Sequence, residues 1–261
     1  MKLFICTLLM LAGLIACHST KNNTKGQQKT ETWVFLMAGQ SNMAGRGAVE
    51  AQDTLTDEKI LTIDKDNNII KAKEPIHFYE PNMKGLDCGL SFAKTLQKNI
   101  NKKVTILLIP TAVGGSYIGQ WLGDSVQRKV RLLTNFKEKM AFAKTKGIVK
   151  GIIWHQGESD ATAKRIPVYE QNLRKLFGIF RSYAGNDKLP IILGELGSYS
   201  KTPENWSAIN DIMKKYVASD PHTALISTAD LTHKGDFVHF NSDGQRQMGQ
   251  RYAEAYLKLK K

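Results

Sequence analysis

The chain has 261 residues, of which 42% are hydrophobic and 23% are charged, so it is long enough for one folded domain and is neither disordered nor fibrous. The formal net charge is +13, but no basic run exceeds two residues. Nucleic-acid-binding proteins usually gather their basic residues into a patch, so this dispersed charge argues against a nucleic-acid partner.

The amino-terminal residues predict export and a lipid anchor. Met1 and Lys2 are followed by an apolar stretch over residues 3–16, which is too short to span a bilayer but is typical of a secretory signal. The sequence Leu14-Ile15-Ala16-Cys17 resembles the bacterial lipobox, in which cleavage leaves the cysteine as a lipidated amino terminus. A plain secretory signal or an uncleaved anchor is the alternative.

These features divide the chain into three parts. Residues 1–17 are interpreted as a lipoprotein signal peptide, residues 18–31 as a flexible polar tether, and residues 32–261 as the folded domain. The expected location is the periplasm, or the outer membrane or cell surface, of a bacterium. Because Cys6 is removed and Cys17 carries lipid, Cys88 is left without a disulfide partner, and we expect it to be buried.

Short apolar runs alternate with helical patterns along the body of the chain. Strands are predicted at residues 34–37, 104–109, 149–154, 190–193 and 223–227, and helices at residues 90–97, 125–144, 168–183, 204–218 and 242–258. This alternation predicts an α/β fold with a central parallel sheet of about five strands and helices on both faces. Residues 46–88 have weak periodicity and are interpreted as a long excursion, a hairpin plus loops, near the site.

Four polar motifs follow predicted strands. They are GQSNMAG at residues 39–45, GGS at residues 114–116, HQGESD at residues 155–160 and DFVH at residues 236–239. Because the carboxyl ends of parallel strands meet at one edge of a sheet, we expect these motifs to lie close together. They supply a hydroxyl, a glycine turn, an amide, carboxylates and an imidazole, which are the groups that acyl transfer needs.

In this order, GQSNMAG, GGS, HQGESD and DFVHFN resemble the SGNH hydrolase superfamily. The more specific resemblance is to its branch of sialate O-acetylesterase domains and family 6 carbohydrate esterases, which include acetyl xylan esterases. The resemblance covers residues 32–258. It implies a three-layer α/β/α flavodoxin-like fold, no cofactor, and removal of acetyl groups from sugar hydroxyls.

Within this resemblance, Ser41 is expected to attack the ester carbonyl and His239 to act as the base. Asp236 lies three residues before His239 and is favoured as the acid that orients the imidazole. Glu158 is the alternative acid; otherwise it orients the loop or binds substrate hydroxyls. Ser41 lacks the second glycine of the G-x-S-x-G motif, which argues against an α/β-hydrolase fold.

The backbone N–H groups of Ser41 and Gly115 are the expected donors to the oxyanion. The third donor in the superfamily is usually an asparagine, and this chain has Gln156 instead. Three further residues are candidates for substrate binding: Gln40, Asn42 and Trp121. Bracing of the loop by Asn42 and core packing of Trp121 are the alternatives. The chain has no C-x-x-C or H-E-x-x-H motif, so no metal site is expected.

The expected function is a lipid-anchored serine carbohydrate O-acetylesterase that acts on acetylated xylan or a similar glycan through an acyl-enzyme. Its partners would be the acetylated carbohydrate and, through Cys17, a membrane. A sialic acid O-acetylesterase is one alternative. A glycan-binding lipoprotein without activity is another, although intact Ser41, Asp236 and His239 argue against it.

Overall fold

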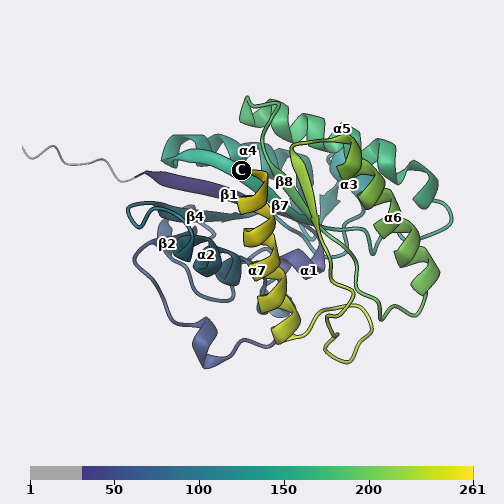
Figure 1. Ribbon diagram of the computed structural model, residues 1–261, viewed down its shortest axis with the longest axis horizontal. Coiled ribbons are helices and arrows are strands. Elements are labelled where there is room, and N and C mark those ends of the chain that lie inside the picture. Colours follow the sequence, from purple (N-terminus) through teal and green to yellow (C-terminus); the bar gives the residue numbers. More distant parts are fainter. Residues whose placement is uncertain (1–30, 261) are drawn as a thin grey trace, which may run out of the picture.

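A mostly parallel seven-stranded sheet lies between two layers of helices (Figure 1). The computed structural model describes residues 31–260, so the predicted signal peptide, Cys17 and nearly all of the predicted tether lie outside the described residues. The strand order is β3-β2-β4-β1-β7-β8-β9. The strands are β1 (Thr32–Gly39), β2 (Ile60–Ile63), β3 (Ile69–Lys71), β4 (Thr105–Pro110), β7 (Ile148–His155), β8 (Ile191–Gly194) and β9 (Thr223–Ile226).

The five predicted strands correspond to β1, β4, β7, β8 and β9, but the predicted strand number was too low by two. The additional strands come from the excursion over residues 46–88, where β2 and β3 form an antiparallel hairpin. The predicted hairpin is therefore present, and β2 also pairs in parallel with β4. The bounds of these two strands were not predicted, because each strand is short and all three residues of β3 are exposed, which leaves little hydrophobic pattern.

Helices cover both faces of the sheet, with α2 and α7 on one face and α4 and α5 on the other (Figure 1). The helices are α1 (Ser41–Ala44), α2 (Gly89–Lys98), α3 (Ile118–Leu122), α4 (Leu132–Lys146), α5 (Ile166–Ala184), α6 (Pro203–Ser219) and α7 (Ser242–Leu259), with short 3₁₀ turns η1 (Ala51–Asp53) and η2 (Pro81–Met83). Among the helices of residues 31–260, none combines the length and apolarity needed to cross a bilayer.

One predicted helix, at residues 125–144, begins later than expected. The helix α4 starts at Leu132, and the preceding residues form a small antiparallel hairpin of β5 (Val126–Gln127) and β6 (Val130–Arg131). Arg128 and Lys129 connect these strands with φ values of 49° and 67°. A right-handed helix cannot include two such residues, so the helical prediction was wrong there.

The side chains of β1 divide the core into two halves. Val34, Leu36 and Ala38 pack toward α3, α4, α5 and α6, whereas Phe35 and Met37 pack toward α2 and α7. This alternation follows from the two-residue period of a strand. Cys88 is fully buried in the second half, as predicted, with its Sγ 3.8 Å from Sδ of Met43.

The centre of the sheet positions the functional residues. The strand β1 lies between β4 and β7, so the connections from β1 and β4 leave toward opposite sides, and the carboxyl end of β1 is the point at which open α/β sheets usually hold their ligands. Gly39 ends β1 with φ 138°, and a Cβ there would lie 2.0 Å from the carbonyl oxygen of His155. Only glycine permits this close approach of β1 to β7, immediately before Ser41.

Candidate active site

Ser41 begins the short helix α1 directly after the central strand. The backbone N–H of Gln40 donates to the carbonyl of His155 at 2.9 Å, which fixes the turn between β1 and α1. The Gln40 side-chain oxygen accepts from the Ser159 N–H at 3.2 Å. Because Gln40 is buried and directed into the HQGESD loop, the prediction that it binds substrate is wrong; it joins two of the motifs instead.

The structure brings Ser41, His239 and Asp236 together in one hydrogen-bonded chain. Nε2 of His239 lies 2.9 Å from Oγ of Ser41, and Nδ1 of His239 lies 2.7 Å from Oδ2 of Asp236. Ser41 and His239 are 198 positions apart in the sequence. A hydroxyl, an imidazole and a carboxylate in this order form the arrangement that raises the nucleophilicity of a serine.

The loop geometry holds Asp236 ionised. Partial burial raises its pKa, but hydrogen bonds from the His239 and Val238 N–H groups and from the His239 ring outweigh that effect. The result is a pKa lowered from 3.8 to about 2. An ionised carboxylate accepts the Nδ1–H of His239 and so leaves Nε2 as an acceptor toward Ser41.

Glu158, the alternative acid, lies in a different environment. Within residues 31–260 its hydrogen-bond and ion-pair partners are Asn42 and His155, not His239. Its Oε1 accepts from Nδ2 of Asn42 at 2.5 Å and lies 3.5 Å from Nδ1 of His155, while its Oε2 is buried without a hydrogen-bond partner. Asp236 therefore has the geometry of the orienting acid, and Glu158 supports the loop that carries Ser41.

Asn42 connects the two ends of the chain beneath this site. Its Nδ2 donates to Glu158 and to the carbonyl of Val238 at 3.1 Å, and its Oδ1 accepts from the Phe240 N–H at 3.1 Å. Asn42 is fully buried, so the prediction that it binds substrate is wrong, and the alternative of a loop brace describes its contacts.

Two backbone N–H groups remain available to stabilise an oxyanion. Within residues 31–260 neither the Ser41 N–H nor the Gly115 N–H has a hydrogen-bond acceptor, and Gly115 is exposed. Gly115 has φ 73°, a conformation that glycine adopts without strain. Gln156 does not join them: it is fully buried, and its Nε2 lies 2.5 Å from Oδ2 of Asp160 and 3.2 Å from the Ser116 carbonyl. Its predicted role as an oxyanion donor is wrong.

Trp121 lies in the core rather than on the site surface. It is 0% exposed, and its ring packs edge-on against Trp154 and Phe180. Its Nε1–H donates to Oγ of Ser116 at 3.0 Å, which anchors the GGS turn from below. The prediction of Trp121 as a sugar-binding residue is therefore wrong, and the alternative of core packing describes its position.

Comparison with known proteins is consistent with this geometry. A family model described as carbohydrate esterase, sialic acid-specific acetylesterase, matches residues 31–258. The chain belongs to this family. It is therefore a carbohydrate esterase, which is a carboxylic ester hydrolase.

Individual relatives of the esterase are distant in sequence. A probable carbohydrate esterase of Arabidopsis thaliana is 26% identical over 261 residues, covering 90% of this chain and 96% of the relative. The X-ray structure of that plant protein gives a TM-score of 0.76 at 25% identity, over 87% of this chain and 98% of that chain.

Two further solved structures have a similar fold to the esterase. NanS gives a TM-score of 0.71 at 17% identity, over 88% of this chain and 97% of its own. A carbohydrate acetylesterase from Xanthomonas citri gives 0.66 at 20% identity, over 88% of this chain but only 56% of its own.

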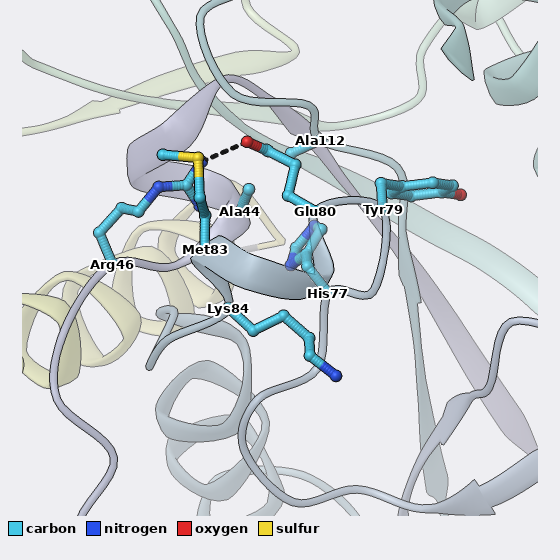
Figure 2. A pocket seen from close by; sticks show the side chains of 8 residues that line it. All are labelled: Ala44, Arg46, His77, Tyr79, Glu80, Met83, Lys84 and Ala112. Atoms are coloured by element: carbon cyan, nitrogen blue, oxygen red, sulfur yellow. Dashed lines mark hydrogen bonds and ion pairs between the residues drawn. The ribbon is translucent and has the colours of Figure 1, made fainter. Parts of the chain in front are cut away.

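Sequence reasoning missed a buried ion pair beside the GGS turn of the esterase. Nη2 of Arg46 lies 2.8 Å from Oε2 of Glu80 (Figure 2). Oε1 of Glu80 accepts from the Gly114 N–H at 2.6 Å. Both side chains are buried. The position of Arg46 directly after the GQSNMAG motif was a signal in the sequence. Its partner Glu80, however, lies in the excursion over residues 46–88, where the periodicity is weak.

No metal site accompanies these groups in the part of the esterase that the structure describes. Across residues 31–260, no three or more histidine, cysteine, aspartate or glutamate side chains are grouped so that they could hold a metal ion.

The depressed pKa of Asp236 predicts an acid-dependent loss of stability. A carboxyl whose pKa is lower in the folded state stabilises the esterase above pH 3.8, and this contribution disappears as the pH falls from 3.8 to about 2. The Asp236 side chain is 36% exposed, so solvent screening keeps the effect small. Urea unfolding at several pH values measures the difference in the free energy of unfolding between wild type and Asp236→Asn. This difference should shrink only as the pH falls from 3.8 to about 2. A constant difference across it would contradict the assigned shift.

Proposed function

We propose that the esterase is a serine carbohydrate O-acetylesterase that removes acetyl groups from a glycan through an acyl-enzyme. The observation that carries this proposal is the hydrogen-bonded chain of Ser41, His239 and Asp236, with distances of 2.9 and 2.7 Å. The family and the plant relative, which is named a probable carbohydrate esterase, support a sugar ester as the substrate.

In the first step, Oγ of Ser41 attacks the acetyl carbonyl while Nε2 of His239 accepts the hydroxyl proton. The negative charge that develops on the carbonyl oxygen is stabilised by the N–H groups of Ser41 and Gly115. The ionised Asp236 stabilises the imidazolium that forms. The bond between the acetyl carbon and the sugar oxygen then breaks, and His239 returns the proton to the departing sugar hydroxyl.

In the second step, water replaces the sugar beside His239. The imidazole accepts a proton from this water as its oxygen attacks the acetyl-serine carbonyl. The same two N–H groups stabilise the second oxyanion. Collapse of this intermediate releases acetic acid and returns Ser41 to its protonated form, so the cycle needs no group beyond these residues and water.

For the substrate, we propose acetylated xylan or a similar plant-type glycan. The exposed Gly115 and the partly exposed Asp236 leave the site open at the surface, where a long glycan chain can lie across it. Acetylated sialic acid is the second candidate, because the matching family is described as sialic acid-specific. A glycan-binding protein without activity is disfavoured by the complete hydrogen-bonded chain.

Acetate release tests this proposal directly. Wild-type protein should release acetate from at least one of acetylated xylan, pectin, mannan and sialoglycan, and should hydrolyse p-nitrophenyl acetate. Ser41→Ala should lower both activities by at least about 10³-fold, because the nucleophile is lost. Glycan binding by wild type without any acetate release would instead support a binding protein.

We also propose that the mature protein is exported and anchored by lipid on Cys17, with the periplasm or the outer membrane or cell surface as its location. This proposal depends on the apolar stretch over residues 3–16 and the lipobox-like residues that end at Cys17. Labelled palmitate should be incorporated into the wild-type chain but not into Cys17→Ala. Equal labelling of the two chains would refute the anchor.

A further inference from the structure

The β5–β6 hairpin has an unusual sequence at its turn. Two residues connect its strands, and both have positive φ: Arg128 at 49° and Lys129 at 67°. Such turns are normally formed by Asn-Gly or similar pairs, because longer side chains are strained there. Non-glycine residues held in this region cluster at functional sites. The hairpin therefore places two cationic side chains where the backbone alone would favour small residues.

This turn forms one wall of a surface pocket of about 520 Å³. The rest of its lining comes from the segment around η2 and includes Tyr79, Glu80, Asn82 and Met83. Figure 2 shows the adjoining smaller pocket, which shares Tyr79, Glu80 and Met83, with Glu80 directed at Arg46 and Met83 beside that pair. The larger pocket has the size of a sugar site, and it combines apolar and polar side chains as such sites do.

Direct contacts connect the pocket to the oxyanion turn. Glu80 of the pocket lining accepts from the Gly114 N–H at 2.6 Å, and Nε2 of Gln127 in the hairpin donates to the Gly114 carbonyl at 2.9 Å. The next residue, Gly115, carries the exposed N–H assigned to the oxyanion. A sugar bound in the pocket would therefore lie beside the acetylated sugar rather than at a remote surface.

The charge in this pocket is not balanced. Its carboxylate, Glu80, is already matched by the buried Arg46 at 2.8 Å. Nε of Arg128 approaches Glu80 only to 3.8 Å, and the Arg128 side chain is 52% exposed. Within residues 31–260, Lys129 has no hydrogen-bond, ion-pair or cation–π partner. The pocket thus presents two cations in excess, and a guanidinium is well suited to bind a carboxylate through two hydrogen bonds.

We propose that this pocket binds the sugar unit next to the acetylated unit in a glycan chain, and that this neighbouring unit carries a carboxylate held by Arg128 and Lys129. The proposal rests on the proposed function, since it assumes that Ser41 deacetylates a glycan. It narrows the substrate class to acetylated acidic polysaccharides, such as those with uronate units.

The test replaces the turn without destabilising it. The double variant Arg128→Asn/Lys129→Gly installs the pair that this turn type favours, so the hairpin is retained while both charges are removed. Three substrates are compared by acetate release: acetylated polygalacturonate, acetylated xylan without uronate groups, and O-acetylated N-acetylneuraminic acid as a single acidic sugar. The quantity compared is the ratio of kcat/KM for acetylated polygalacturonate to kcat/KM for the neutral xylan. This ratio should exceed one in wild type, and the double variant should lower it about tenfold. Added salt should reduce the ratio in wild type more than in the variant.

A matched variant controls for net charge. Lys98→Ala/Lys102→Ala also removes two exposed positive charges, but these lie between the end of α2 and the start of β4, at the amino ends of the strands. This variant should leave the ratio unchanged. An unchanged ratio in Arg128→Asn/Lys129→Gly would overturn the proposal. So would a fall in kcat/KM for the single acidic sugar that equals the fall for the polygalacturonate. Failure of the proposed function is distinguishable, because Ser41-dependent hydrolysis of p-nitrophenyl acetate would then occur without acetate release from any of the three carbohydrates.

Discussion

Replacement of Asp236 by Asn is expected to lower kcat for p-nitrophenyl acetate roughly 10³- to 10⁴-fold, with little change in KM. The carboxylate of Asp236 accepts the Nδ1–H of His239 at 2.7 Å and so leaves Nε2 free to take the proton of Ser41. An asparagine amide can donate to Nδ1 instead. It would then favour the other tautomer, in which Nε2 carries a hydrogen and cannot act as the base.

Glu158→Gln should be much less damaging, with kcat within about tenfold of wild type. The glutamine oxygen can still accept from Nδ2 of Asn42, which is the contact that supports the Ser41 loop. Asp243→Asn is the matched control, because this aspartate is exposed at the start of α7 and pairs with Arg246 away from the site. Initial-rate kinetics over a range of pH would separate the three variants. A loss in Glu158→Gln that equals or exceeds the loss in Asp236→Asn would transfer the acid role to Glu158.

The sequence was sufficient to predict that Ser41, Asp236 and His239 lie together, because its signals are local or lie at strand ends. The apolar run of β1 places Ser41 at the sheet edge, and the three-residue spacing of Asp236 and His239 within one loop brings their side chains together. The choice between Asp236 and Glu158 needed coordinates. It depends on which acid reaches Nδ1 of His239, and that distance is a property of the folded loop.

The errors at Gln156 and Trp121 have a common cause. Each residue follows a strand or turn that ends at the site, so its position in the sequence suggested contact with substrate. In the structure both side chains are buried. Gln156 forms hydrogen bonds within the loops, and Trp121 packs against Trp154. The hairpin at residues 126–131 was hidden because it directly precedes α4, so the predicted helix was extended back over it.

Loss of the Arg46–Glu80 pair is expected to have the largest effect on stability. Arg46→Met removes the cation that lies 2.8 Å from Glu80 and leaves a carboxylate in a site where the two side chains are 4% and 6% exposed. Breaking a buried pair in this way typically costs about 3–5 kcal/mol. We expect the lower end of that range, about 3 kcal/mol, because Arg128 lies 3.8 Å from Glu80 and can partly compensate.

The same variant should reduce kcat/KM, because Glu80 also holds the Gly114 N–H next to Gly115, the proposed oxyanion donor. Urea unfolding and p-nitrophenyl acetate hydrolysis would measure the two effects separately. Arg251→Met is the control, since its partner Asp230 is exposed to solvent and this pair should contribute much less to stability than the buried one.

A double variant distinguishes an uncompensated charge from a simple loss of packing. In Arg46→Met/Glu80→Gln no buried charge remains, and the glutamine oxygen can still accept from Gly114. The double variant should therefore be more stable than Arg46→Met alone, even though it carries one more substitution. Equal or lower stability would mean that Arg46 acts through packing. Recovery of stability together with recovery of kcat/KM would show that the ion pair serves the active site by keeping Gly114 and Gly115 in place.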